Sequence, residues 1–129
     1  MESKTMIHLD TNILVDITTS KPQGIAEGLL RNGAQFACSA ITWTEFCYGP
    51  LKDEQKKYIY HFIGGRVIPY TQEESKIATE LFNQTGRRRG SQTDCMIAAT
   101  AIHLQAPIAT KNLKDFQRFA NHGLHIQEF

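Results

Sequence analysis

The sequence predicts an α/β fold with a mainly parallel sheet that helices cover on both faces. Short apolar segments typical of strands alternate with longer segments whose apolar residues recur at helical spacing, and the connections are short. The length of 129 residues fits a single domain, residues 1–129, that can bury a core. With 41% hydrophobic and 21% charged residues, the composition excludes collagen, a coiled coil and a disordered chain.

Five short apolar segments are expected to be strands because turn or cap residues bound them. The cap-rich turn Asp10-Thr11-Asn12 ends the first strand, and Pro69 marks the end of the third. The expected strands cover residues 6–9, 35–38, 66–70, 107–110 and 124–126.

Helices are expected where apolar residues recur every three or four positions. Ser39 and Ser91 are expected to cap helices, and Thr71 and Glu74 match a capping box. The segment 96–102 is apolar on most sides, so its helix should be central to the fold. The expected helices lie around residues 13–17, 22–30, 41–48, 52–62, 74–82, 96–102 and 113–120.

Charge and targeting features narrow the class of protein. The 14 Lys and Arg against 13 Asp and Glu exclude a histone-like polycation, so any nucleic-acid binding needs a local basic patch. The three cysteines, Cys38, Cys47 and Cys95, form no C-x-x-C pair and are expected to be reduced thiols. No signal-peptide core or membrane-spanning apolar run is visible, so we expect a cytoplasmic protein with no membrane association.

Polar side chains follow two of the expected strands. Asp10 directly follows the first strand, and Asn112 and Asp115 follow strand 107–110. In open parallel sheets, ligands bind outside the carboxyl ends of the strands. The sequence therefore places these three side chains at one edge of the sheet.

Two further acids lie in apolar surroundings. Asp94 opens the apolar helix, and Glu45 lies in a helix rich in large apolar residues. Each acid alone has a structural alternative: Asp10 as an N-cap, Asp94 as a helix-dipole partner, or Glu45 facing solvent. Asp115 and Glu128 are, taken singly, typical surface residues. Converging carboxylates need cations, however, and hard oxygen ligands favour Mg²⁺ or Mn²⁺ and phosphodiester hydrolysis.

A basic loop precedes Asp94. Arg87, Arg88 and Arg89 stand between two glycines, and Lys111 adds a cation at the acidic edge. Arginine pairs bidentately with phosphate, although a charged loop can also serve only solubility.

Four segments, 7–12, 42–45, 93–101 and 109–116, follow one another in an order and at spacings that resemble the PIN-domain ribonucleases. Among these, the chain is most similar to the VapC-type toxins of prokaryotic toxin–antitoxin pairs. The resemblance implies a three-layer α/β/α sandwich with a mainly parallel central sheet. It also implies a Mg²⁺- or Mn²⁺-dependent endoribonuclease that cleaves RNA phosphodiester bonds by a metal-activated water.

The resemblance implies a role for each candidate residue. Asp10 and Asp94 would bind the metal, and Glu45 would orient or deprotonate the attacking water. Many relatives have Asp where this chain has Asn112, so either Asn112 or Asp115 is the fourth site residue. Because Asn112 is uncharged, we expect one firmly held metal and a second that depends on the substrate. Thr11 and Asn12 would form a supporting polar shell around the acids. The residues implied to bind RNA are Arg87, Arg88, Arg89 and Lys111.

The resemblance also implies two protein partners, a VapB-like antitoxin and a second copy of the chain. An antitoxin of this kind lays a C-terminal segment across the active-site groove and often offers an arginine to the acids. The aromatic residues Tyr48, Tyr58, Tyr60 and Phe62 are either its contact surface or part of the core.

Other functions fit less well. A haloacid-dehalogenase-type phosphatase needs a second Asp two residues after the first, and Asn12 occupies that position. No glycine-rich nucleotide-binding motif occurs. A non-catalytic RNA- or partner-binding module on the same fold stays as the alternative, and it predicts that the acids tolerate alanine and bind no metal.

Overall fold

The centre of the fold is a sheet of four parallel strands in the order β3-β2-β1-β4. The structure, a computed structural model, describes residues 6–19, 28 and 33–129. In the register of the sheet, Met6 of the first strand pairs with Gln35, and His8 pairs with Ile108. The predicted α/β fold with a parallel sheet is confirmed. The strands are β1 (Met6–Leu9), β2 (Gln35–Ser39), β3 (Val67–Ile68) and β4 (Ile108–Ala109).

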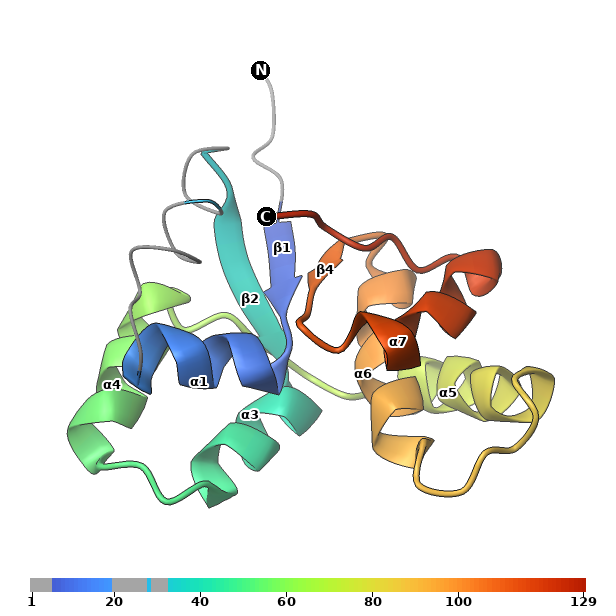
Figure 1. Ribbon diagram of the computed structural model, residues 1–129, viewed down its shortest axis with the longest axis horizontal. Coiled ribbons are helices and arrows are strands. Elements are labelled where there is room, and N and C mark those ends of the chain that lie inside the picture. Colours follow the sequence, from blue (N-terminus) through green and yellow to red (C-terminus); the bar gives the residue numbers. More distant parts are fainter. Residues whose placement is uncertain (1–5, 20–27, 29–32) are drawn as a thin grey trace.

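Helices lie on both sides of this sheet and form a three-layer α/β/α sandwich. Figure 1 shows α1 and α4 on one side of the strands, and α5, α6 and α7 on the other. The described helices are α1 (Thr11–Thr19), α3 (Ala40–Tyr48), α4 (Asp53–Phe62), α5 (Gln72–Gln84), α6 (Gln92–His103) and α7 (Leu113–Phe116), which continues as the 3₁₀ helix η1 (Gln117–His122).

The sheet separates two hydrophobic cores because successive strand residues point to opposite faces. Ile7 and Leu9 of β1 pack with residues of α1, α3 and α4. Ile108 of β4 packs instead with residues of α5, α6 and η1, while the next residue, Ala109, joins the first core. Helix α6 is central as predicted, since it buries Cys95 and every residue from Ile97 to Ala101.

Two of the predicted helix starts are confirmed in atomic detail. The Ser39 hydroxyl oxygen accepts a 3.0 Å hydrogen bond from the Thr42 amide at the start of α3. At the start of α5, the Thr71 amide donates a 2.7 Å bond to Glu74, which completes the capping box. Ser91 differs: its hydroxyl donates to the carbonyl of Arg88, 2.7 Å away, and makes no cap bond to α6.

Other expectations need correction. The last predicted strand, 124–126, is a single parallel bridge between Ile108 and Ile126, because the chain after η1 meets the sheet at one point only. The third strand is two residues long, and the predicted helix 113–120 changes to 3₁₀ geometry after Phe116. Most of the predicted helix 22–30 lies outside the described residues.

Two further expectations concern the cysteines and the membrane. Cys38, Cys47 and Cys95 are free thiols, as expected. In the described part of the chain, none of the helices has the length and hydropathy needed to cross a bilayer.

Candidate active site

Asp10 sits where β1 ends and is fixed by neutral donors. Its side chain is buried, with 5% of the residue exposed. The Thr11 amide donates to Oδ1 at 2.8 Å, and the Thr110 hydroxyl donates to Oδ2 at 2.7 Å. Asn12 adds a longer bond of 3.3 Å to Oδ2. Burial raises the pKa of Asp10, and these hydrogen bonds oppose the rise.

Glu45 reaches the same edge from α3. Its carboxylate is exposed and accepts a 2.8 Å hydrogen bond from the Thr11 hydroxyl. Thr11 therefore links two acids, because its amide binds Asp10 and its hydroxyl binds Glu45. Helices α1 and α3 pack against each other, which brings Glu45 to Thr11, the residue after Asp10, across 34 residues of sequence.

Asp94 enters from the first turn of α6. Its side chain is 26% exposed, and its Oδ2 lies 3.7 Å from Nη2 of Arg118. Burial raises the pKa of Asp94 to about 6, with further increases from the charges of Asp10 and Asp115, and Arg118 opposes them. The acids are thus close enough in space to repel one another.

Asn112 and Asp115 act together at the end of β4. The Asn112 amide nitrogen Nδ2 donates a 2.9 Å bond to Oδ2 of Asp115, and the backbone amide of Asn112 donates to the Thr110 hydroxyl at 2.9 Å. Of the two residues, Asp115 brings the fourth carboxylate to this edge, and Asn112 orients it.

A comparison with protein-family models decides which family this arrangement belongs to. The model described as PIN domain matches residues 7–121. The chain belongs to the PIN domain family. The resemblance predicted from the sequence is therefore confirmed.

Relatives and solved structures of this PIN domain are consistent with that result. Ribonuclease VapC1 of Methanocaldococcus jannaschii is 32% identical over 130 aligned positions, which cover 98% of this chain and 89% of the relative. The structure of VapBC2 from Rickettsia felis, bound to a promoter DNA fragment, matches with a TM-score of 0.72 and 27% identity over 97% of this chain and 99% of that chain. VapBC-1 from Haemophilus influenzae matches with a TM-score of 0.70 and 26% identity, over 96% and 98%.

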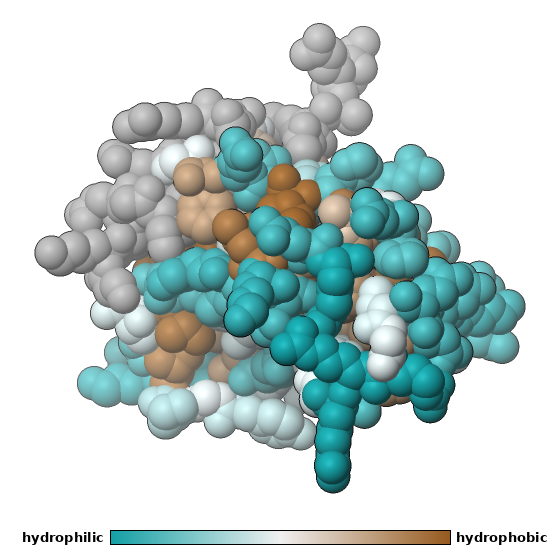
Figure 2. Space-filling view, turned by 45° about the vertical axis from the view of Figure 1, so that its right-hand side comes forward, coloured by the Kyte–Doolittle hydropathy of each residue, from teal (hydrophilic) through white to brown (hydrophobic). Residues whose placement is uncertain are grey.

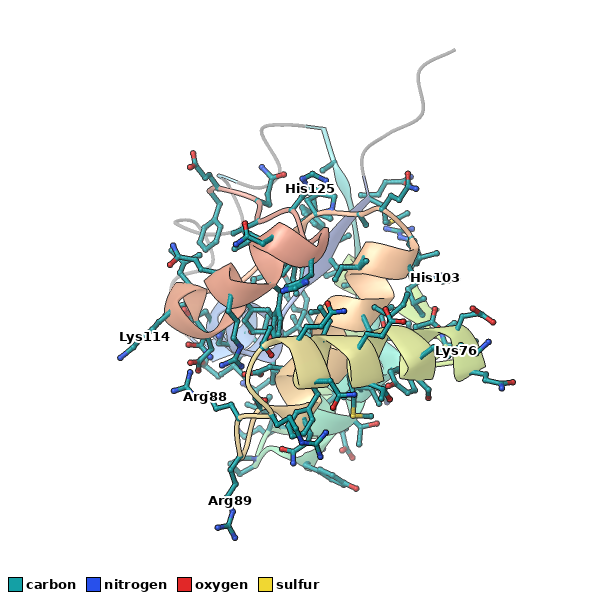
Figure 3. All side chains as sticks on the ribbon, turned by 90° about the vertical axis from the view of Figure 1, so that its right-hand side faces the viewer. Lys76, Arg88, Arg89, His103, Lys114 and His125 are labelled. Carbon is teal, nitrogen blue, oxygen red and sulfur yellow. The ribbon has the colours of Figure 1, made fainter. Side chains whose placement is uncertain are left out.

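The three loop arginines of this PIN domain point in different directions. Arg87 folds back over the Phe82 ring, 5.0 Å from its centroid, and hydrogen-bonds Asn83. Arg88 lies 3.8 Å from Asp115, so it meets the acidic edge. Figure 3 shows Arg89 extending away from the body of the molecule. Figure 2 shows this side as largely hydrophilic, with hydrophobic residues visible in separate patches.

Lys111 directly follows Thr110 at this edge, and its side chain turns toward α1. Its ammonium group pairs with Asp16 of α1, and its backbone amide donates a 3.1 Å bond to the Asn12 side chain. Asn12 therefore ties the end of β4 to the start of α1.

Arg118 of η1 is a residue that the sequence reasoning missed. It lines a small cleft of about 120 Å³ with Arg88, Asp94 and Asp115. The available signal was its position: an arginine directly before the buried Phe119 and three residues after Asp115, in a segment that turns inward.

The donors at this edge suit a hard divalent cation. Carboxylate and amide oxygens are the ligands that Mg²⁺ and Mn²⁺ prefer, and Mg²⁺ commonly takes only one or two carboxylates and keeps several waters. Within residues 6–19, 28 and 33–129, no group of three or more acid, histidine or cysteine side chains is arranged to hold a metal ion by itself. A metal bound here would therefore need water or substrate oxygens beside one or two of these carboxylates.

Proposed function

We propose that this PIN domain is a Mg²⁺- or Mn²⁺-dependent endoribonuclease and acts as the toxin of a VapBC-like toxin–antitoxin pair. The observation that carries the proposal is the meeting of Asp10, Glu45, Asp94 and Asp115 at the carboxyl edge of the sheet. Family membership and similarity to proteins named Ribonuclease VapC1 support it.

The proposed metal ligands are Asp10 and Asp94. Burial is the main cause that raises the pKa of both carboxyl groups in the metal-free protein, and the charges of Asp10 and Asp115 raise the pKa of Asp94 further. A bound cation relieves that penalty, since it supplies the opposite charge that buried carboxylates lack. When bound, it also stabilises charge on phosphate oxygens and lowers the pKa of water.

The other polar residues would position the reacting groups. Glu45 is the exposed carboxylate, so we assign it to orienting the attacking water or taking its proton. Thr11 fixes Glu45 relative to Asp10. Asn112 holds Asp115 by a 2.9 Å bond.

The basic residues would bind the RNA backbone. Arg89 is exposed and borders the cleft that Asp94 and Asp115 line. Arg88 would exchange Asp115 for phosphate, and Arg87 would support the loop through Phe82. Lys111 would reach phosphate only by leaving Asp16.

An antitoxin is the proposed protein partner, as the VapBC complexes among the structural matches suggest. Tyr48, Tyr58 and Tyr60 are 84%, 50% and 50% exposed and offer it a contact surface. Phe62 is excluded from that surface, because its ring stacks on Phe36 with centroids 5.1 Å apart. A homodimer is also proposed, from the same resemblance.

The test is RNA cleavage under metal control. The purified protein, treated with EDTA and dialysed, should leave a single-stranded RNA intact, and Mg²⁺ or Mn²⁺ should restore cleavage. Cleavage that persists in EDTA would contradict metal dependence. If the protein neither cleaves any RNA tested nor binds Mn²⁺ in a calorimetric titration, the non-catalytic binding module replaces the proposal.

A further inference from the structure

Arg118 occupies a position inside the acidic site that the proposed chemistry does not use. Its guanidinium group packs on the Phe119 ring, 4.8 Å from the centroid, and Nη2 points to Oδ2 of Asp94 at 3.7 Å. That distance is too long for a hydrogen bond, so the contact is an attraction between charges. The side chain is 17% exposed.

The buried nitrogens of Arg118 are unusually poor in partners. Nε and Nη1 are shielded from solvent and have no hydrogen-bond partner among the described residues. Burying a charged group without hydrogen-bond partners costs free energy, and an opposite charge nearby offsets that cost. The nearest opposite charge is Asp94, which itself is repelled by Asp10 and Asp115.

The cations are distributed unevenly over the site. Arg118 faces Asp94 and Arg88 faces Asp115, so both acids of this pair have a guanidinium neighbour. On the other side, the described hydrogen bonds to Asp10 and Glu45 come only from neutral groups of Thr11, Asn12 and Thr110. The positive charge of the site is therefore concentrated on the Asp94–Asp115 side.

We propose that Arg118 is a built-in counter-ion that closes the Asp94–Asp115 side to divalent cations and limits the protein to one bound metal. The single metal would then be held on the Asp10 side, away from the guanidinium groups of Arg118 and Arg88. A second divalent cation between Asp94 and Asp115 would meet the guanidinium charge at close range. Arg118 is thus a positioning residue, and the inference rests on the proposed metal dependence.

The experiment counts bound metal ions instead of measuring cleavage. Mn²⁺ is titrated into the protein in a calorimeter, and free Mn²⁺ is measured in parallel by electron paramagnetic resonance. The wild type should bind one Mn²⁺. Arg118→Met, which keeps the aliphatic stem but removes the charge, should bind two, and Arg118→Lys should return the number to one.

Lys114→Met is the matched control, because it removes one positive charge from the same segment. Lys114 is exposed and points outward from α7 (Figure 3). This variant should bind one Mn²⁺. If it binds two, general charge rather than Arg118 sets the number, and the inference is wrong.

The remaining outcomes separate the two claims. One Mn²⁺ in Arg118→Met, or two in the wild type, overturns the role of Arg118 and leaves metal dependence intact. No Mn²⁺ in the wild type overturns the proposed metal dependence itself. If Arg118→Met lacks the wild-type circular dichroism spectrum, the titration is done with Arg118→Gln, which has an amide in place of the charged group. Arg118→Gln should also bind two Mn²⁺.

Discussion

The Thr110 hydroxyl donates a 2.7 Å hydrogen bond to the Asp10 carboxylate across 100 residues of sequence. Both residues directly follow neighbouring parallel strands, β1 and β4, in which Leu9 pairs with Ala109. The same Thr110 oxygen accepts the Asn112 amide at 2.9 Å. One buried hydroxyl therefore connects the first acid of the site to the turn that carries Asn112 and Asp115.

Replacing Thr110 by valine should destabilise the protein. Valine has a similar shape but cannot donate to Asp10, and a lost buried hydrogen bond to a charged group costs roughly 1–3 kcal/mol. The free energy of unfolding, measured with urea at pH 7, should fall by that amount. Thr110→Ser keeps the hydroxyl and should lose less; equal stability of Thr110→Val and the wild type would contradict this role.

Protonation of Glu74 should destabilise the folded protein in acid. Burial would raise its pKa, but hydrogen bonds from Thr71 and the His103 charge outweigh this, and the pKa lies below its usual 4.5. Because the folded-state pKa is lowered, the stabilisation is present above about pH 4.5 and is lost as the pH falls below it. Glu74→Gln should cost roughly 1–2 kcal/mol at pH 7 and flatten this acid limb of the stability curve.

The exposed neighbour Glu73 provides the control for Glu74. Its carboxylate is 60% exposed and pairs with Lys76 at 3.7 Å, a surface contact worth about 0–1 kcal/mol. Glu73→Gln should leave the acid limb unchanged. An equal change in both variants would show that the capping bonds of Glu74 do not set its pKa.

Metal binding should release protons near pH 6. The pKa of Asp94 is raised to about 6 in the metal-free protein, so about half of the molecules carry a proton there at pH 6. A metal ligand must be deprotonated, so binding of Mn²⁺ should release about half a proton at pH 6 and almost none at pH 8. Calorimetry in buffers of different ionisation enthalpy measures this number, and a binding enthalpy at pH 6 that is independent of the buffer would contradict Asp94 as a ligand.

Arg89 should contribute a phosphate contact without reading the base sequence. Removing one contact to single-stranded RNA reduces the slope of log binding constant against log salt by about 0.7. Arg89→Ala, measured in an Asp94→Asn background that prevents cleavage, should show this reduction for RNAs of different sequence. Lys76→Ala, on an exposed position of α5, should keep the full slope; no difference between the two would place the RNA elsewhere.

The sequence was informative where local pattern determines structure. Residues Asp10 and Asn112 follow short apolar strands, and the rule that parallel strands end at one edge sufficed to bring them together. The Thr71–Glu74 capping box was also readable, because the two residues lie within one turn. Roles of the site residues in metal binding and cleavage stay predictions.

Other features depend on tertiary contacts that no local pattern contains. Thr110 meets Asp10 through the pairing of strands 100 residues apart, and Arg118 meets Asp94 where Phe119 of η1 shares a hydrophobic core with α6. Lys111 was expected to add a cation at the acidic edge, and no local pattern predicts that its ammonium group pairs with Asp16 of α1, 95 residues away in the sequence. The last predicted strand shows the same limit, since its apolar residues serve the core while only Ile126 bridges to the sheet.

The most direct measurement of the central claim is the rate of Mg²⁺-dependent RNA cleavage by Asp94→Asn compared with Asp53→Asn. Both variants replace one carboxylate by an amide near a helix start, but Asp53 lies on α4, outside the acidic site. With both proteins folded by circular dichroism, we predict that Asp94→Asn slows cleavage by about 100-fold or more and that Asp53→Asn cleaves at the wild-type rate. Equal rates for Asp94→Asn and the wild type would contradict the account.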